Sequence, residues 1–222
     1  MSDLVVYGNY LSQPGRSLMS FCKLSGIEFK YHNLNAFNGE HLTEEYTKIN
    51  PFQSFPAIVH NGFNVWETGA ILVYLADAYN VDNQWYPKDI KLRARIDAYI
   101  HWHHQNVREP LLDYIMVKYG PKAHEGGGLT EETEAPFKAR LQQWYETFTW
   151  VLSETHYVAR TPTATIADIL AFNELFNAQM INIDLDSHPA IKAWYEEIAS
   201  IPQVQELCPQ AQEIIRNLTS SH

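Results

Sequence analysis

Residues 52–71 read FQSFPAIVHNGFNVWETGAI, a pattern of two short strands followed by a helix. Residues 57–60 and 63–66 are β-type runs, and the Asn61-Gly62 pair between them is a strong hairpin signal. An apolar helical pattern begins directly after the second run. The segment therefore predicts a hairpin that leads into a helix, with a polar pocket at the junction.

The polar residues of this segment predict a site for a peptide-like ligand. Pro56 heads a strand, where it either spares an edge hydrogen bond or marks a cis peptide bond, and a cis bond would turn the backbone groups of Phe55 outward. Thr68 follows Glu67 at the predicted start of the helix, where free N–H groups and the positive dipole end favour a carboxylate. Glu67 would meanwhile hold an ammonium group.

The N-terminal third predicts a thioredoxin-like domain over residues 1–79. Residues 4–7 and 27–34 are β-type runs, residues 14–24 have helical periodicity, and a short helix is expected near residues 43–48. With the hairpin and its helix the order is βαβαββα. A strand-helix-strand crossover needs a parallel pair and the hairpin an antiparallel one, so the sheet must be mixed, with four strands and helices on both faces.

The rest of the chain predicts an all-helical domain over residues 88–222. The polar residues 80–87 end in proline and form a plausible linker. A long helix over residues 88–119 is expected to bend at Pro110, and a break follows at Pro121 and residues 126–128. The remaining helices are expected at residues 131–153, from Thr165 with a capping box to Asp168, at 189–200 and at 204–218.

Composition excludes several classes of protein. The chain has 222 residues, a formal net charge of −10 and no Lys/Arg run longer than two, so it lacks the basic surface that nucleic acid or an anionic membrane would need. No apolar run approaches the ~20 residues of a membrane-spanning helix, and the first predicted strand leaves no room for a secretion signal. Cys22 and Cys208 lie far apart, which suits a reducing compartment. We expect a cytoplasmic protein.

A series of short motifs runs along the chain: YLSQPGR at residues 10–16, HL at 41–42, NP at 50–51, FP at 55–56, ETGAIL at 67–72, WYP at 85–87, RAR at 93–95 and TIAD at 165–168. Together these motifs resemble those of the soluble glutathione transferases, and the first is similar to the theta class in particular. The resemblance implies a two-domain α+β/α fold, a homodimer, no metal, and transfer of the co-substrate glutathione to small hydrophobic electrophiles.

The resemblance also implies which residues bind glutathione. Ser12 would be the catalytic residue that stabilises the thiolate. The further binding residues would be Gln13 beside it, His41 and Gln53 for the glycyl end, Phe55 and Pro56 for the cysteinyl backbone, and Glu67 and Thr68 for the γ-glutamyl end. Gln53 stands where theta members often carry lysine, and Gln105 stands where some carry an aspartate that reaches across the dimer.

The position of Ser12 suits the chemistry that the resemblance implies. Lowering a thiol pKa from about 8.5 to about 6.5 requires roughly 2.7 kcal/mol of preferential thiolate stabilisation. A charge-assisted hydrogen bond contributes about 1.5 to 3 kcal/mol and a helix N-terminus about 0.3 to 1, so together they suffice. Ser12 precedes a predicted helix, so it is either this donor or simply the N-cap. Tyr7 and Tyr10 compete for the role, and Arg16 is expected to add positive potential.

The second substrate's pocket is predicted less directly. Tyr114, Met116, Tyr119 and Trp144 are candidates for its lining, although aromatic residues at helical spacing are more often part of a core. Arg108 is the polar candidate, and we take Arg108 and Tyr114 as pocket residues. Because theta relatives continue beyond the position of Leu218, we expect an open pocket.

The sequence gives less support to other functions. His101 and His104 have i, i+3 spacing, and His103 lies between them, but no third metal ligand is suitably spaced. No G-x-S-x-G motif supports a hydrolase, and residues 12–15 replace the Cys motif of a thiol-disulfide oxidoreductase. A glutathione-dependent dehalogenase of small haloalkanes and a non-catalytic binding or adaptor protein remain as alternatives.

Overall fold

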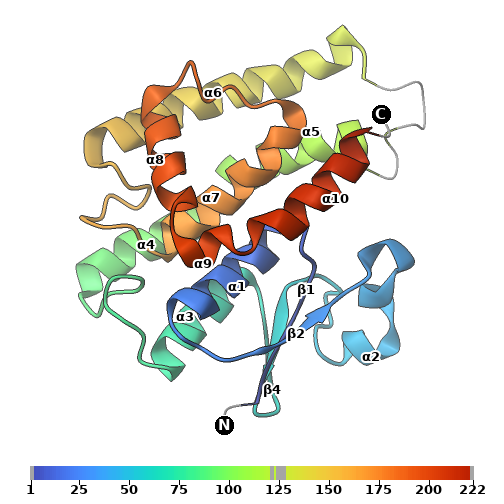
Figure 1. Cartoon of the computed structure of the whole chain (residues 1–222), viewed down its shortest axis with the longest axis vertical. Coiled ribbons are helices and arrows are strands. Elements are labelled where there is room, and N and C mark those ends of the chain that lie inside the picture. Colours follow the sequence, from blue (N-terminus) through green and yellow to red (C-terminus); the bar gives the residue numbers. More distant parts are fainter. Residues whose placement is uncertain (1–2, 121–122, 124–128, 221–222) are drawn as a thin grey trace.

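The computed structural model describes residues 3–120, 123 and 129–220. It has a sheet-containing half built from the N-terminal third of the chain and a helical half built from the remainder (Figure 1). Both parts of the predicted fold class are therefore confirmed. The predicted break at Pro121 and residues 126–128 lies outside the described residues.

The four strands form one mixed sheet in the order β2-β1-β3-β4. β1 (Leu4–Gly8) runs parallel to β2 (Lys30–Asn33) and antiparallel to β3 (Ala57–His60). β3 in turn pairs antiparallel with β4 (Phe63–Trp66). The crossover and the hairpin thus impose the two pairing modes that the sequence predicts.

Local turn chemistry sets the ends of the strands. Asn61 and Gly62 have φ values of 50° and 82°, as a two-residue hairpin with positive φ at both central positions requires. β2 begins at Lys30 rather than at the predicted Ile27, because its pairing with β1 starts at the Val5–Lys30 partners. Ile27 instead packs into the main core.

Helices cover both faces of the sheet, as predicted. α1 (Gln13–Leu24) and α3 (Thr68–Ala78) share a core with Leu4 and Val6 of β1. α2 (Glu44–Thr47) packs on the opposite face, where Tyr46 contacts a smaller core. Two short 3-10 turns precede α2, at Ala36–Asn38 and Glu40–Leu42.

The helical half is built around α7 (Ile166–Ala178), which is buried along its whole length. α1, α4, α5 and α8 all pack against it. None of the described helices is long and apolar enough to cross a membrane. The other elements are α4 (Ile90–His103), a π-helical turn (His104–Arg108), α5 (Glu109–Tyr119), α6 (Glu131–Thr155), a 3-10 turn (Gln179–Ile181), α8 (Pro189–Ala199), α9 (Pro202–Gln205) and α10 (Cys208–Ser220).

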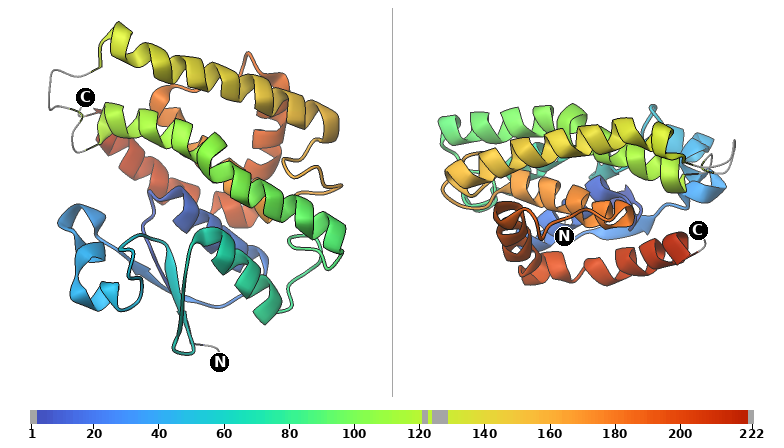
Figure 2. Two further views of the ribbon diagram at one scale, coloured as in Figure 1. Left: turned by 180° about the vertical axis from the view of Figure 1, so that it is seen from behind. Right: turned by 90° about the horizontal axis from the view of Figure 1, so that it is seen from above.

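The predicted helix over residues 88–119 is interrupted before Pro110 rather than bent at it. α4 and α5 follow one another along one rod (Figure 2), with the π-helical turn His104–Arg108 between them. Pro110 lies in the first turn of α5. Because proline lacks an N–H and its ring clashes with the carbonyl four residues earlier, the strain is taken up in the preceding turn. Arg108 ends this turn, and its guanidinium reaches Gln13 of α1 in the sheet half.

The predicted helix over residues 204–218 is wrong as a single element. The structure has α9 and α10, separated by Glu206 and Leu207. Pro209 stands at the second position of α10, where a missing N–H is tolerated, whereas inside a continuous helix it would break a hydrogen bond.

The predicted capping box at the start of α7 is confirmed and extends beyond the helix. Asp168 is fully buried, and its Oδ2 accepts from the backbone N–H of Thr165 at 2.8 Å. Its Oδ1 accepts from the N–H of Val158 and from Trp194 Nε1, both at 3.0 Å. One carboxylate therefore ties the start of α7 to the preceding loop and to α8.

We predict that Asp168→Ala lowers the free energy of unfolding by about 3 kcal/mol or more, because the four buried donors of Val158, Thr165 and Trp194 lose their acceptor. Denaturant unfolding measures this. Thr130→Ala, which removes the exposed N-cap of α6, is the control and should cost only about 1 kcal/mol. Equal losses in the two variants would contradict the bridging role of Asp168.

Candidate active site

Ser12 is the N-cap of α1. Its φ and ψ are −69° and 117°, and its Oγ accepts a hydrogen bond from the N–H of Gly15 at 3.3 Å. The capping interpretation is thus correct, but it uses Oγ only as an acceptor. A hydroxyl also carries one proton to donate, and the donor of Ser12 stays available to a ligand.

The loop that carries Ser12 is held by the buried side chain of Arg16. All five of its N–H groups are bonded: two to the carbonyls of Tyr10 and Leu11, and three to Asn173 and Asn177 of α7, at 2.6 to 3.1 Å. Burial lowers the pKa of Arg16 to about 10. Its role is therefore to fasten the loop to α7, rather than to project positive potential into an open site.

A cavity of about 410 Å³, called here the Ser12 cavity, lies beside this loop. The sheet half contributes Ser12, Gln13 and His41 to its wall. The helical half contributes Arg108 and a mainly apolar surface consisting of Leu112, Ile115, Met116, Tyr119, Met180 and Leu218. The cavity is polar on one side and apolar on the other.

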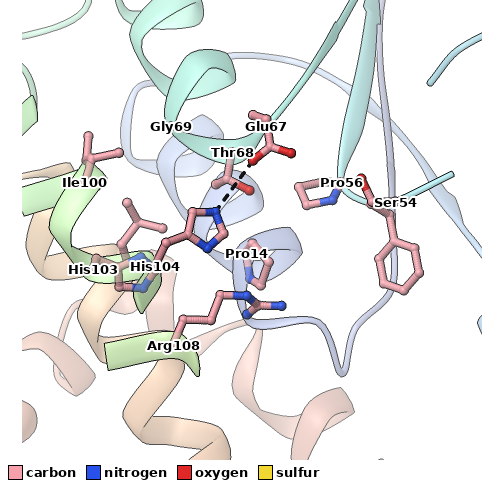
Figure 3. Close-up of a pocket in the computed structure, with 12 residues that line it drawn as sticks. Pro14, Ser54, Pro56, Glu67, Thr68, Gly69, Ile100, His103, His104 and Arg108 are labelled. Carbon is pink, nitrogen blue, oxygen red and sulfur yellow. Dashed lines mark ion pairs between the residues drawn. The ribbon is translucent and has the colours of Figure 1, made fainter. Parts of the chain in front are cut away.

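A second cavity of about 150 Å³, called here the Thr68 cavity, lies at the start of α3 (Figure 3). Glu67 and Thr68 face His104 across it, and His104 Nε2 lies 3.6 Å from Glu67 Oε2. Glu67 has φ 67° and ψ 113°, a conformation that costs a non-glycine residue about 1 to 3 kcal/mol and is found at ligand clamps. Thr68 and Gly69, the first two residues of α3, also line this cavity, so the N-terminus of the helix borders it.

The two halves meet closely at Gly69. A Cβ added to Gly69 would lie 2.5 Å from Cγ2 of Ile100 in α4, well inside van der Waals contact. Only glycine allows α3 and α4 to approach this near, and both residues line the Thr68 cavity.

Phe55 and Arg108 line both cavities. The Phe55-Pro56 peptide bond is cis, one of the two alternatives that the sequence left open. The His41 ring packs edge-on against Phe55 with 5.6 Å between centroids, and its buried Nδ1 has no hydrogen-bond partner among the described residues. A ligand that spans both cavities would therefore pass over Phe55.

Two predicted residues are not brought to either cavity. The amide Nε2 of Gln53 donates to Thr47 Oγ1 at 3.1 Å and to the carbonyl of Leu42 at 3.4 Å, so it stabilises its own loop. Tyr114 points to α6, where it stacks on Phe137 and hydrogen-bonds Glu134.

Helical geometry explains why Tyr114 does not line the Ser12 cavity. Leu112, Ile115, Met116 and Tyr119 share one stripe of α5 at i, i+3, i+4 and i+7, and Tyr114 lies off it. Of the four lining candidates, Met116 and Tyr119 reach the Ser12 cavity, whereas Tyr114 and Trp144 do not. The stripe was visible in the sequence, but its spacing is equally that of a core helix.

Tyr7 and Tyr10, the alternatives to Ser12, pack against other aromatic side chains. Tyr7 packs against the rings of His32 and Tyr46, with centroid distances of 5.2 and 6.0 Å. Tyr10 packs against Tyr31 at 5.0 Å. Neither residue lines the Ser12 cavity. Of Ser12, Tyr7 and Tyr10, only Ser12 therefore lines this cavity.

The three histidines of α4 and the π-helical turn point to different places. His101 is exposed, His103 is buried beside Glu174, and His104 faces Glu67. Among the described residues no three His, Cys, Asp or Glu side chains gather as a metal site would require. Sequence reasoning missed Glu174 and the pocket-facing positions of His103 and His104, because the packing of α7 against α4 and the π-helical turn brings these distant segments together.

Comparisons of the sequence and of the structure with known proteins point to one family. The family described as glutathione S-transferase, N-terminal domain, matches residues 2–77, and glutathione S-transferase, C-terminal domain, matches residues 106–208. Glutathione S-transferase theta-1 of Mus musculus is 31% identical over 213 residues, covering 96% of this chain and 88% of its own length. The apo structure of human glutathione-S-transferase T1-1 superposes with a TM-score of 0.87 at 27% identity, covering 98% of this chain and 91% of that chain.

A third relative has a ligand. The human theta-class glutathione transferase in complex with the glutathione conjugate of 1-menaphthyl sulfate has a TM-score of 0.86 at 25% identity, covering 99% of this chain and 89% of that one.

We predict that Asn177→Ala loosens the Ser12 loop. The change removes an acceptor of Arg16 and the donor to the Leu11 carbonyl at 2.8 Å, and should lower the free energy of unfolding by about 2 kcal/mol. Amide hydrogen exchange at residues 9–12 should accelerate. Asn64→Ala is the control, since the Asn64 amide also bonds a backbone carbonyl but lies in β4. Unchanged exchange at residues 9–12 would show that Asn177 does not hold the loop.

Proposed function

This chain belongs to the glutathione S-transferase family and is a transferase, and we propose that it ionises the thiol of bound glutathione with Ser12 and transfers the sulfur to small hydrophobic electrophiles. The observation that carries this proposal is the position of Ser12, at once the N-cap of α1 and part of the wall of a largely apolar cavity.

We propose that glutathione lies across both cavities. Its γ-glutamyl carboxylate would bind the N–H groups and hydroxyl at Thr68, with the ammonium at Glu67. Its cysteinyl backbone would pair with Phe55, and its glycyl carboxylate would lie toward His41. This arrangement is supported by the unpartnered Nδ1 of His41 and by Phe55 lining both cavities. Gln53 is left out, because its amide is already bonded within its loop.

The proposed thiolate stabilisation combines two contributions. The Ser12 hydroxyl would donate to the sulfur while Oγ keeps its bond from Gly15, and the first turn of α1 would supply its positive dipole end. Together these provide about 2 to 4 kcal/mol, which covers the roughly 2.7 kcal/mol needed to lower the thiol pKa by about two units. The thiol proton would pass to solvent, since no further proton-transfer residue is needed.

The electrophile would occupy the apolar part of the Ser12 cavity. The sulfur lone pair forms the new carbon–sulfur bond, and the leaving group departs with the electron pair of the bond that breaks. Holding the two reactants together in an apolar pocket supplies much of the acceleration. The dehalogenase alternative would use the same apolar wall for a smaller electrophile, and turnover of an aryl halide against a small alkyl halide separates the two.

We further propose a homodimer. Trp102 and Trp150, which are 37% and 57% exposed, lie on the face formed by α4 and α6, where a groove of about 530 Å³ runs between the helices. Large exposed aromatic side chains gathered on one face are typical of interaction surfaces. Light scattering should give twice the 25.6 kDa mass of the chain, and a mass of one chain would reject the dimer.

The domain limits at residues 1–79, 80–87 and 88–222, and a cytoplasmic location, stay predictions.

We predict that Ser12→Ala lowers kcat about ten-fold or more and raises the pKa of the bound thiol, because the donated hydrogen bond is lost. Tyr7→Phe should change little. Turnover of an aryl halide and of a small alkyl halide measures the loss of kcat. The thiolate absorbance that appears on adding glutathione, followed against pH, measures the pKa of the bound thiol.

Ser12→Ala also removes a helix cap, so Thr130→Ala is the matched control: it loses an N-cap of similar strength far from the site and should keep full turnover. If Tyr7→Phe abolished the thiolate while Ser12→Ala retained it, the assignment of Ser12 would be rejected. Glutathione binding without ionisation in the unmodified protein would support the adaptor alternative.

A further inference from the structure

Glu174 is a carboxylate in the middle of α7 with an exposed fraction of 0%. Such a group is strongly disfavoured in a core unless it is paired. Its Oε1 accepts from Arg108 Nη1 at 2.9 Å, and His103 Nε2 lies 3.4 Å from the same oxygen without hydrogen-bonding geometry. Within the described part of the chain, no donor reaches Oε2. The pair with Arg108 is therefore the principal contact of this buried charge.

Arg108 occupies a special place in the site. It comes from the end of the π-helical turn and lines both cavities, and its side chain extends toward Pro14 of α1 (Figure 3). Its Nη1 also lies 3.4 Å from Oε1 of Gln13, the residue after Ser12. The other guanidinium nitrogens, Nε and Nη2, make no hydrogen bond to any described residue. They remain available to a ligand where the two cavities join.

We propose that Glu174 is a positioning residue that holds the Arg108 guanidinium at the wall shared by the two cavities, where its unused N–H groups face the reacting sulfur and the electrophile. This inference rests on the proposed function, which pairs the cysteinyl backbone with Phe55 and places its sulfur at Ser12, in the cavity that Arg108 also lines. Without its carboxylate partner the long arginine side chain regains its rotamers and extends into solvent.

The charge state of Glu174 is consistent with this role. Burial by itself opposes ionisation of the carboxyl, but the positive charge of Arg108 and the neighbouring His103 keep its pKa below the usual value. Glu174 is thus ionised throughout the range in which the enzyme would work, and it acts as a fixed anchor rather than as a proton carrier. The nearest groups of α4 and the π-helical turn are donors, which fits an acceptor-only carboxylate.

The experiment compares Glu174→Met, Glu174→Gln, Arg108→Met and the double variant Glu174→Met/Arg108→Met. Glu174→Met should lower kcat/KM for an aryl halide about ten-fold and raise the pKa of the bound thiol, with a smaller effect on KM for glutathione. The same change in the Arg108→Met background should alter kcat/KM less than about two-fold, because the carboxylate acts only through the arginine. Glu174→Gln, whose amide oxygen still accepts from Arg108, should recover most of the activity.

Stability separates positioning from a purely structural role. Arg108→Met leaves an unpaired carboxylate in the core, so the double variant should be more stable in denaturant than Arg108→Met, yet no more active. Leu175→Ala, a buried neighbour on α7 that does not line either cavity, is the control: it should lower stability without changing the thiol pKa.

Equal losses of kcat/KM from Glu174→Met in the two backgrounds would overturn the proposal, as would a raised thiol pKa in Leu175→Ala. If the unmodified protein forms no thiolate with glutathione, the proposed function itself fails. If instead the unmodified protein forms the thiolate and turns over normally, but the Glu174 variants behave the same way, only the positioning role of Glu174 fails.

Discussion

The guanidinium of Arg16 is the contact on which the candidate site depends. A single buried side chain uses all five N–H groups to join the carbonyls of Tyr10 and Leu11 to Asn173 and Asn177 of α7. The loop that carries Ser12 belongs to the sheet half, and α7 is the central helix of the other half. Because a buried charge is tolerated only with all its donors satisfied, the two halves cannot shift relative to each other without a large loss of stability. The position of Ser12 is therefore set by the helical half as much as by its own strand and helix.

Each half contributes a different chemistry to the site. The sheet half presents backbone and short polar groups from the ends of β1, β3 and β4, while α5 and α10 contribute an apolar wall. The close approach at Gly69 and Ile100 brings these surfaces together at the Thr68 cavity. A peptide ligand is thus matched to one surface and a hydrophobic partner to the other, with Phe55 and Arg108 at the line where they join. The π-helical turn before Pro110 directs Arg108 into that line.

Ser12 also illustrates how one hydroxyl serves both fold and chemistry. As the N-cap of α1 it accepts from Gly15, and this bond orients Oγ beside the first turn of the helix. Because this bond uses only a lone pair, the hydroxyl proton remains for donation to a ligand. The capping role and the proposed catalytic role are therefore not alternatives, since one uses a lone pair and the other the hydrogen. Glu67 shows a related combination, because its positive φ precedes the α3 turn that presents N–H groups to the ligand.

The sequence by itself determined the elements whose signals are local. Asn61-Gly62 specified the hairpin, the 27–34 run and the crossover specified a mixed sheet, and Thr165 with Asp168 specified the start of α7. Short motifs were also enough to single out Ser12, His41, Phe55 and Thr68. Only the tertiary structure decided the contacts between distant segments: Arg16 with Asn173 and Asn177, and Arg108 with Glu174. It also decided which stripe of α5 faces the cavity, excluding Tyr114, and that Gln53 bonds within its loop. The physical reason is that periodicity tells which residues share a face of a helix, whereas the packing of the other elements determines what that face meets.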